Sequence, residues 1–240
     1  MRIAILQCGH PQRELLETRG PYAQWIAERL GLTLADVEIL DAVGGAPLPP
    51  PTGIDGLFVT GSPLSVRDHA PWSVNATGWL KAAVDAGVPT LAICYGHQML
   101  GEALGGAVEL NPQGREIGVI EIERLDDDPL FEGLPKRFPV IITHSDAVTV
   151  DPPAVPIIAR SDRCANQAMR IGPRARSIQW HPEMDAEIIR AIIRGRAAAI
   201  DAETGPGSAE AFAEGAWDVP SSQIIFDNFV RHFMQPERGR

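Results

Sequence analysis

Short apolar runs alternate with longer amphipathic stretches through the first half of the chain. Residues 2–8 are apolar nearly throughout, which is typical of a strand buried on both faces of a parallel sheet. Further strands are predicted at 37–40, 54–60 and 90–93, and helices at 21–30, 73–86 and after residue 94. This order predicts an α/β fold with an open, mostly parallel central sheet that is flanked by helices on both faces.

The pattern changes after Gly106. Short apolar runs separated by Pro and Asp predict hairpins and extra strands that form a small sheet at the side of the main one, at 107–110, 117–124, 140–143, 147–150, 157–160 and 166–171. Residues 175–180 are expected to return to the main sheet. Helices are predicted at 185–202, from residue 208 and at 221–234. A length of 240 residues suits a single domain over 1–240.

Cys94 stands where a predicted strand passes directly into a predicted helix. Ala92 lies two residues before it and Gly96 two residues after it. This spacing is typical of a nucleophile elbow, in which small neighbours let the strand and helix backbones approach each other closely. The N-terminus of a helix also stabilises the ionised form of a thiol placed there. Taken alone, Cys94 could equally be a buried core cysteine.

A histidine and a carboxylate follow the later strand at 175–180. His181 and Glu183 are two residues apart, which supplies a base and a partner that orients it. Gly61, Cys94 and His181 each come just after a predicted strand. Since the functional groups of open α/β sheets gather at the carboxyl ends of the strands, we expect these three residues to meet in one site.

These motifs together resemble the class I glutamine amidotransferases, the triad type with a Cys-His-Glu centre. The resemblance rests on Ala92-Ile93-Cys94-Tyr95-Gly96-His97-Gln98 and His181-Pro182-Glu183, and it extends from about residue 3 to about residue 234. Thr60-Gly61-Ser62-Pro63 is similar to the family's oxyanion loop, with Ser62 where the family usually has Gly. Ala92 likewise replaces a usual Gly. The resemblance implies a flavodoxin-like sheet and an enzyme that needs no cofactor.

The resemblance also implies roles for individual residues. Cys94 is expected to be the nucleophile, His181 the base and Glu183 the group that orients His181. The backbone N–H groups of Gly61 and Tyr95 are expected to form the oxyanion hole.

Three further residues are expected to contribute to substrate binding. By resemblance, Gln98 belongs to the glutamine pocket, and His144 lies in a His-Ser-Asp segment that many family members carry. Arg115, in the stretch from Gly114 to Gly118, would clamp a substrate carboxylate or form an ion pair with Glu116.

Three functions remain open at this point. The first is hydrolysis of the glutamine side-chain amide through a γ-glutamyl thioester, releasing ammonia to a separate synthetase subunit. The second is a γ-glutamyl hydrolase that needs no partner, because residues 114–118 resemble γ-glutamyl peptidases of the superfamily. The third is a non-catalytic regulatory or binding module on the same scaffold, which the complete set of Cys94, His181 and Glu183 disfavours.

Composition limits the partners. A net charge of −10 and a pI near 5.0 argue against nucleic acid, which needs a basic surface. The arginines at 160–176 are therefore interpreted as a solvated face, and the acidic run at 126–128 as a helix start. Three cysteines, with no metal-ligand spacing, predict a reducing compartment without a disulfide framework or a metal. No long apolar run or signal-like segment appears, so we expect a cytoplasmic protein without membrane contact.

Overall fold

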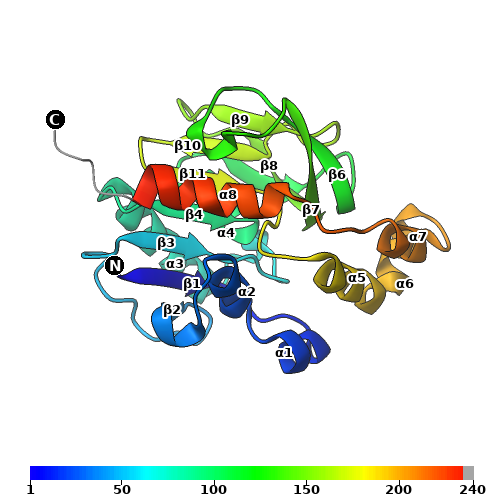
Figure 1. The fold of residues 1–240 in the computed structure, drawn as a ribbon, viewed down its shortest axis with the longest axis horizontal. Coiled ribbons are helices and arrows are strands. Elements are labelled where there is room, and N and C mark those ends of the chain that lie inside the picture. Colours follow the sequence, from blue (N-terminus) through cyan, green and yellow to red (C-terminus); the bar gives the residue numbers. More distant parts are fainter. Residues whose placement is uncertain (235–240) are drawn as a thin grey trace.

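The computed structural model describes residues 1–234, so the last six residues of the domain predicted over 1–240 lie outside the described part. Its centre is a nine-stranded sheet in the order β2-β1-β3-β4-β11-β10-β9-β6-β7 (Figure 1). The first five are parallel: β2 (Glu38–Asp41), β1 (Ile3–Gln7), β3 (Gly56–Val59), β4 (Thr90–Ile93) and β11 (Ala175–Ile178).

The sheet continues with antiparallel strands beyond β11. These are β10 (Ala168–Ile171), β9 (Ile157–Arg160), β6 (Glu116–Arg124) and β7 (Arg137–His144). Two further strands, β5 (Ala107–Leu110) and β8 (Asp146–Val150), pair only with each other as a small antiparallel sheet. The predicted fold class is thus confirmed, and most of the predicted side strands extend the main sheet.

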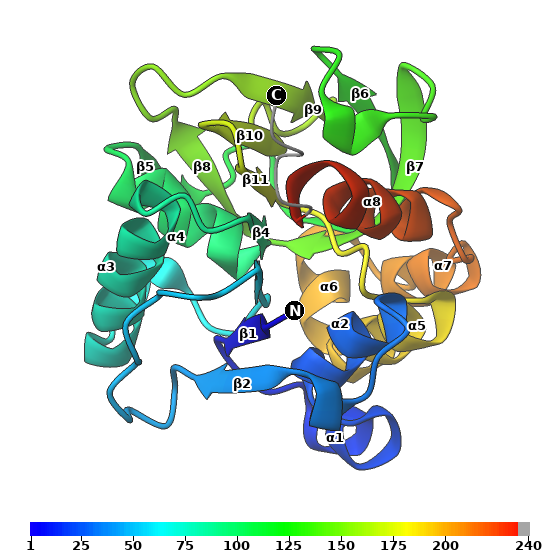
Figure 2. The ribbon, with the colours of Figure 1, turned by 60° about the vertical axis from the view of Figure 1, so that its left-hand side comes forward.

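Helices cover both faces of the sheet (Figure 2). The alternating residues of β1 show why its first four residues are all apolar. Ala4 and Leu6 pack in the core with α3 (Pro71–Asp85) and α4 (Tyr95–Ala103), whereas Ile3 and Ile5 pack in the core with α2 (Tyr22–Arg29) and α8 (Ser221–Phe229). Burial on both sides favours apolar residues along this strand, and its one polar residue, Gln7, stands at its end.

The remaining helices are α1 (Arg13–Arg19), α5 (Ala186–Gly195), α6 (Ala197–Thr204) and α7 (Ser208–Glu214). Short 3-10 turns occupy Leu34–Asp36, Val66–Asp68 and Pro129–Phe131, and a π-helical turn follows α8 over Val230–Met234. The helix predicted over 185–202 is broken in two at Arg196, where φ is −119° and ψ is 14°. Gly195 favours this break because glycine has a low helix propensity, and a larger residue does not fit there because Gln12 occupies the space that a Cβ would need.

Arg176 corrects the interpretation of the arginine cluster as a solvated face. Its side chain is 4% exposed and donates to both carboxylate oxygens of Asp128, each at 2.9 Å. The same Asp128 accepts a hydrogen bond from the backbone N–H of Leu130 and so caps the 3-10 turn, as the acidic run predicted. A buried carboxylate therefore serves both as a cap and as a counter-ion.

Candidate active site

Cys94 occupies a sharp turn between β4 and α4. Its φ of 49° and ψ of −97° are rare for a residue with a side chain, and such a conformation costs on the order of 1–3 kcal/mol. The backbone holds this strain in place, because the N–H of Cys94 donates to Ile178 on β11 at 2.8 Å and its carbonyl accepts from Gln98 at 3.0 Å. The predicted elbow is therefore present, with Tyr95 as the first residue of its helix.

Small residues make this turn possible. A Cβ added to Gly96 would lie 2.8 Å from Val59 Cγ1 and 3.2 Å from Ala92 Cβ. The missing side chain at Gly96 leaves the space that the methyl group of Ala92 occupies. This explains why Ala92 is tolerated where Gly was expected.

His181 and Glu183 follow β11 and are both buried. His181 Nδ1 lies 2.7 Å from Glu183 Oε1, so this nitrogen donates to the carboxylate. The backbone N–H of His181 donates to Ile141 on β7 at 2.8 Å, which fixes the start of the loop. The carboxylate thus sets the ring with Nε2 directed away from Glu183.

The charge state of His181 depends on its neighbours. Burial alone lowers the pKa of His181, but the charges of Glu183 and then Cys94 outweigh it and raise this pKa to about 10. His181 Nε2 makes no hydrogen bond of ordinary geometry within residues 1–234. Cys94 is nevertheless one of the neighbours that favour the protonated ring.

Gly61 brings the loop after β3 against both groups. A Cβ added to Gly61 would lie 2.8 Å from His181 Cε1 and 3.5 Å from Cys94 Cβ. The ends of β3, β4 and β11 therefore meet as predicted, and only glycine allows the loop to approach so closely.

Two cavities open beside these residues. The larger, of about 260 Å³, has Cys94, Tyr95, Gln98 and His144 in its wall. The smaller, of about 40 Å³, lies on the His181 side. The cavities share Ser62, Pro63, Thr143 and Arg196. A ligand in the larger cavity would thus reach the thiol from one side, with the imidazole on the other.

The predicted substrate-binding residues all line the larger cavity, but their polar atoms already have partners in the protein. Gln98 Nε2 donates to the Asp146 carbonyl at 2.9 Å and to Gln179 Oε1 at 3.1 Å. Arg115 donates to the two carboxylate oxygens of Glu203 on α6 at 2.7 and 2.9 Å. Arg115 therefore forms its ion pair with Glu203, and the predicted pair with Glu116 is wrong.

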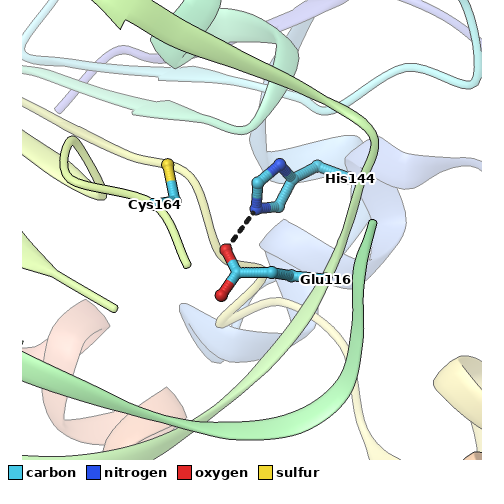
Figure 3. A group of neighbouring side chains, drawn as sticks. All are labelled: Glu116, His144 and Cys164. Carbon is cyan, nitrogen blue, oxygen red and sulfur yellow. Dashed lines mark hydrogen bonds and ion pairs between the residues drawn. The ribbon is translucent and has the colours of Figure 1, made fainter. Parts of the chain in front are cut away.

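Glu116 instead belongs to a buried cluster with His144 and Cys164 (Figure 3). His144 Nε2 lies 3.0 Å from Glu116 Oε2, and His144 Nδ1 lies 2.9 Å from the Asp146 carbonyl. Both ring nitrogens face hydrogen-bond acceptors, which leaves neither free to act as a base on a substrate. The arrangement makes His144 a support for the pocket wall at Asp146.

One potential ligand atom from each of these three residues lies within 4.8 Å of the other two, and such a set can hold a metal ion. The same atoms already form a hydrogen-bonded network. Ser161 Oγ donates to Glu116 Oε1 at 2.7 Å, Gln167 Nε2 donates to Glu116 Oε2 at 2.7 Å, and Cys164 Sγ donates to the Asn166 carbonyl at 3.4 Å. Burial, and next Glu116, raise the pKa of Cys164 to about 12, which keeps it a thiol.

Sequence reasoning missed several charged residues of the pocket. Ser65 Oγ and Arg67 both donate to the carboxylate of Asp146, the latter at 3.0 Å. Arg196 enters the wall from the break between α5 and α6. The His-Ser-Asp segment drew attention to its histidine alone, and no spacing marked Arg67 or Arg196.

Comparisons with known proteins agree with this arrangement. The sequence model of the family described as glutamine amidotransferase class-I matches residues 16–191. A glutamine-hydrolyzing GMP synthase of Aeropyrum pernix is 38% identical over 170 residues, which cover 69% of this chain and 31% of that protein. One subunit of the glutamine-hydrolyzing GMP synthase of Archaeoglobus fulgidus is 33% identical over 132 residues, covering 55% of this chain and 67% of that subunit.

The fold comparison extends over more of the chain. The crystal structure of a glutamine amidotransferase from Thermotoga maritima matches with a TM-score of 0.70 at 20% identity, covering 96% of this chain and 98% of that one. Within residues 1–234, no helix has the length and apolar character needed to cross a lipid bilayer.

Proposed function

Because the chain belongs to the class-I glutamine amidotransferase family, we propose that it hydrolyses the side-chain amide of glutamine, or of a related γ-glutamyl compound. The observation that carries this proposal is the strained thiol of Cys94 beside the His181–Glu183 pair, at the meeting point of three strand ends. A buried structural cysteine needs neither the strained turn nor the neighbouring histidine and carboxylate.

The first half of the reaction forms an acyl-enzyme. Once His181 Nε2 holds its proton, Cys94 attacks the amide carbonyl carbon, while Glu183 holds the ring and stabilises its charged form. The N–H groups of Gly61 and Tyr95 stabilise the oxyanion, at about 3–4 kcal/mol per donor. The C–N bond then breaks, ammonia leaves with the proton from His181, and a γ-glutamyl thioester remains.

The second half of the reaction releases the acid. Water attacks the thioester carbonyl as His181 takes one of its protons, and the C–S bond breaks to return the thiol. In this mechanism Gln98, Arg115 and His144 shape the pocket: Gln98 and His144 support Asp146, and Arg115 pairs with Glu203. Their polar atoms already bind within the protein, so they orient the pocket wall more than they contact the substrate.

We also propose that the ammonia passes to a separate synthetase subunit. The names of the relatives support this, since the Archaeoglobus protein is one subunit of a glutamine-hydrolyzing GMP synthase. The match covers 31% of the Aeropyrum protein, so most of that relative lies outside the matched region. The alternative is a γ-glutamyl hydrolase that acts without a partner, and a non-catalytic module is the third possibility.

The test is a panel of glutamine and γ-glutamyl amides, assayed for released ammonia or amine with wild type and Cys94→Ser. We expect glutamine turnover by wild type, loss in the variant, and alkylation of Cys94 by a glutamine-like analogue. Turnover that rises with an added synthetase favours the amidotransferase, and partner-independent cleavage of γ-glutamyl peptides favours the hydrolase. A wild-type protein that releases nothing from any of these compounds, and resists the analogue, would refute catalysis.

A further inference from the structure

Three arginines line the larger cavity, and they differ in how their charge is balanced. Arg67 forms an ion pair with Asp146 at 3.0 Å, and Arg115 forms one with Glu203 at 2.7 Å. Arg196 has no carboxylate partner among residues 1–234 and donates no side-chain hydrogen bond there. It is therefore the cation of this pocket whose charge the described protein leaves unbalanced.

The backbone fixes the position of Arg196. It lies at the break between α5 and α6, and its carbonyl accepts hydrogen bonds from Ala199 and Ile200, each at 3.0 Å. Its side chain borders both the larger cavity beside Cys94 and the smaller one beside His181. Arg196 thus lines the two cavities that flank the proposed reacting groups.

The surroundings of Arg196 contain further unused polar groups. Thr143 Oγ1 borders both cavities and Gln12 Nε2 borders the smaller one, and both are buried without a hydrogen-bond partner in the described chain. Burial raises the pKa of Tyr22, which also lines the smaller cavity, and the positive charge of Arg196 partly opposes this rise. Buried polar groups without partners are unusual in native proteins, so this region is suited to a polar ligand.

The charge of the wall selects the kind of ligand. The acidic residue that lines the larger cavity is Asp146, and Ser65 and Arg67 already bind it. A carboxylate entering the pocket therefore finds a free guanidinium. Arginine binds carboxylates with two parallel hydrogen bonds, which fixes both position and orientation.

We propose that Arg196 binds a carboxylate of the substrate and so selects γ-glutamyl compounds that carry one close to the reacting amide. This inference rests on the proposed function. The carboxylate comes either from the α-position of the glutamyl part or from the leaving amine, and both present the same chemistry. Arg196 follows the end of the family match at residue 191, so this selectivity belongs to the α5–α6 segment of the chain.

The experiment separates binding from turnover. Affinities of L-glutamine and its α-amide are measured by calorimetry on Cys94→Ala, alone and combined with Arg196→Gln. Initial rates on L-glutamine, γ-glutamylglycine and γ-glutamylethylamine are measured with an otherwise native Cys94. Arg196→Lys retains the charge, and Arg194→Gln is the matched control, because Arg194 lies on the same helix and pairs with Glu210 at the surface.

If Arg196 binds the α-carboxylate, Arg196→Gln weakens glutamine binding about tenfold or more and removes the preference for glutamine over its α-amide. If it binds a carboxylate on the leaving amine, the preference for γ-glutamylglycine over γ-glutamylethylamine falls by a similar factor. Either result supports the proposal. We expect Arg196→Lys to keep part of the preference for the carboxylate compound and Arg194→Gln to leave this preference unchanged.

The proposal is overturned if Arg196→Gln changes every affinity and rate by the same factor, or changes none. It is also overturned if no carboxylate compound binds to Cys94→Ala. Failure of the proposed function has a different signature: the carboxylate-dependent binding is present, but wild type releases no ammonia or amine.

Discussion

The chain contains two buried sets of cysteine, histidine and glutamate, and they differ in how their polar atoms are used. In the set of Cys94, His181 and Glu183, His181 Nε2 has no hydrogen bond of ordinary geometry to any of residues 1–234, and the cysteine backbone is strained. In the set of Cys164, His144 and Glu116 (Figure 3), both ring nitrogens and both carboxylate oxygens are hydrogen-bonded, although only the bond between His144 and Glu116 is drawn there, and the cysteine donates to a carbonyl.

The difference teaches that residue types alone do not make a reactive centre. Strain, an unused ring nitrogen and an adjoining cavity equip the first set for chemistry, whereas the second holds the pocket wall in place. The predictions that follow each remove one part of this contrast.

Replacing Cys94, the proposed nucleophile, should have the largest effect. We expect Cys94→Ala to lower glutamine turnover by at least about 10⁴-fold, because no other group can form the thioester. Cys164→Ala serves as the matched control and should keep most of the activity. The measurement is ammonia release at saturating glutamine, and comparable losses in the two variants would contradict the distinction drawn between the sets.

The cysteines should also differ in alkylation. Burial raises the pKa of Cys8 well above its ordinary value, and burial and Glu116 raise the pKa of Cys164 to about 12. Cys94 borders the larger cavity, so iodoacetamide should modify it at least about 100-fold faster than the others. Peptide mass spectrometry over time gives the three rates. Alkylation of Cys164 before Cys94 would be inconsistent with the closed environment of Cys164.

A methyl group at Gly61 should disturb the first set without removing any of its members. In Gly61→Ala the new Cβ would lie 2.8 Å from His181 Cε1 and would displace the ring or the loop. A displacement of about 1 Å can cost about 10²-fold in rate, and we expect a loss in kcat of that order. Gly78→Ala on α3, where a Cβ meets no atom within 4 Å, is the control and should retain full activity.

The second set should respond in stability more than in chemistry. Glu116→Gln removes the charge opposite His144, and breaking a buried pair of this kind costs about 3 kcal/mol or more in the free energy of unfolding. Urea denaturation measures the loss. Glu121→Gln, at an exposed position of the same strand, should be neutral, and equal effects of the two substitutions would argue against the support role of Glu116.

The smallest effect concerns His97, which is fully buried on α4. Burial, and next the charge of His144, lower the pKa of His97 to about 3. The unfolded chain therefore binds more protons than the folded one between about pH 3 and 6.5, so stability is lost as the pH falls below 6.5. The free energy of unfolding should fall by about 1 kcal/mol for each pH unit in this range. His97→Gln should flatten this dependence, as measured by urea denaturation across the pH range, and His10→Gln, at an exposed position, is the control.

Much of the fold could be predicted because strands that are buried on both faces consist mostly of apolar residues. Full burial on both faces made β1, β3 and β4 continuous apolar runs. Helix α1 was missed, since only Leu15 of its seven residues is buried. The break at Arg196 was hidden because the alanines after it favour a helix as much as the isoleucines before it.

The site divides in the same way. Cys94, Gly61 and His181 could be placed because each follows a strand, and the ends of parallel strands meet at one edge of a sheet. The partners of Arg115 and Glu116 could not be predicted, because Glu203 and His144 come from distant segments that no spacing relates to them. Tertiary packing alone decides which of several nearby charges are paired.

The ion pair between Arg115 and Glu203 ties the start of β6 to α6, the helix that directly follows Arg196. With Glu203 partly exposed, dissolved ions can compete for both partners and loosen this tie. Selectivity between substrates would then fall in concentrated salt, while the rate of bond cleavage at the rigid elbow would not. Selectivity and rate would therefore depend differently on the ionic strength of the solution.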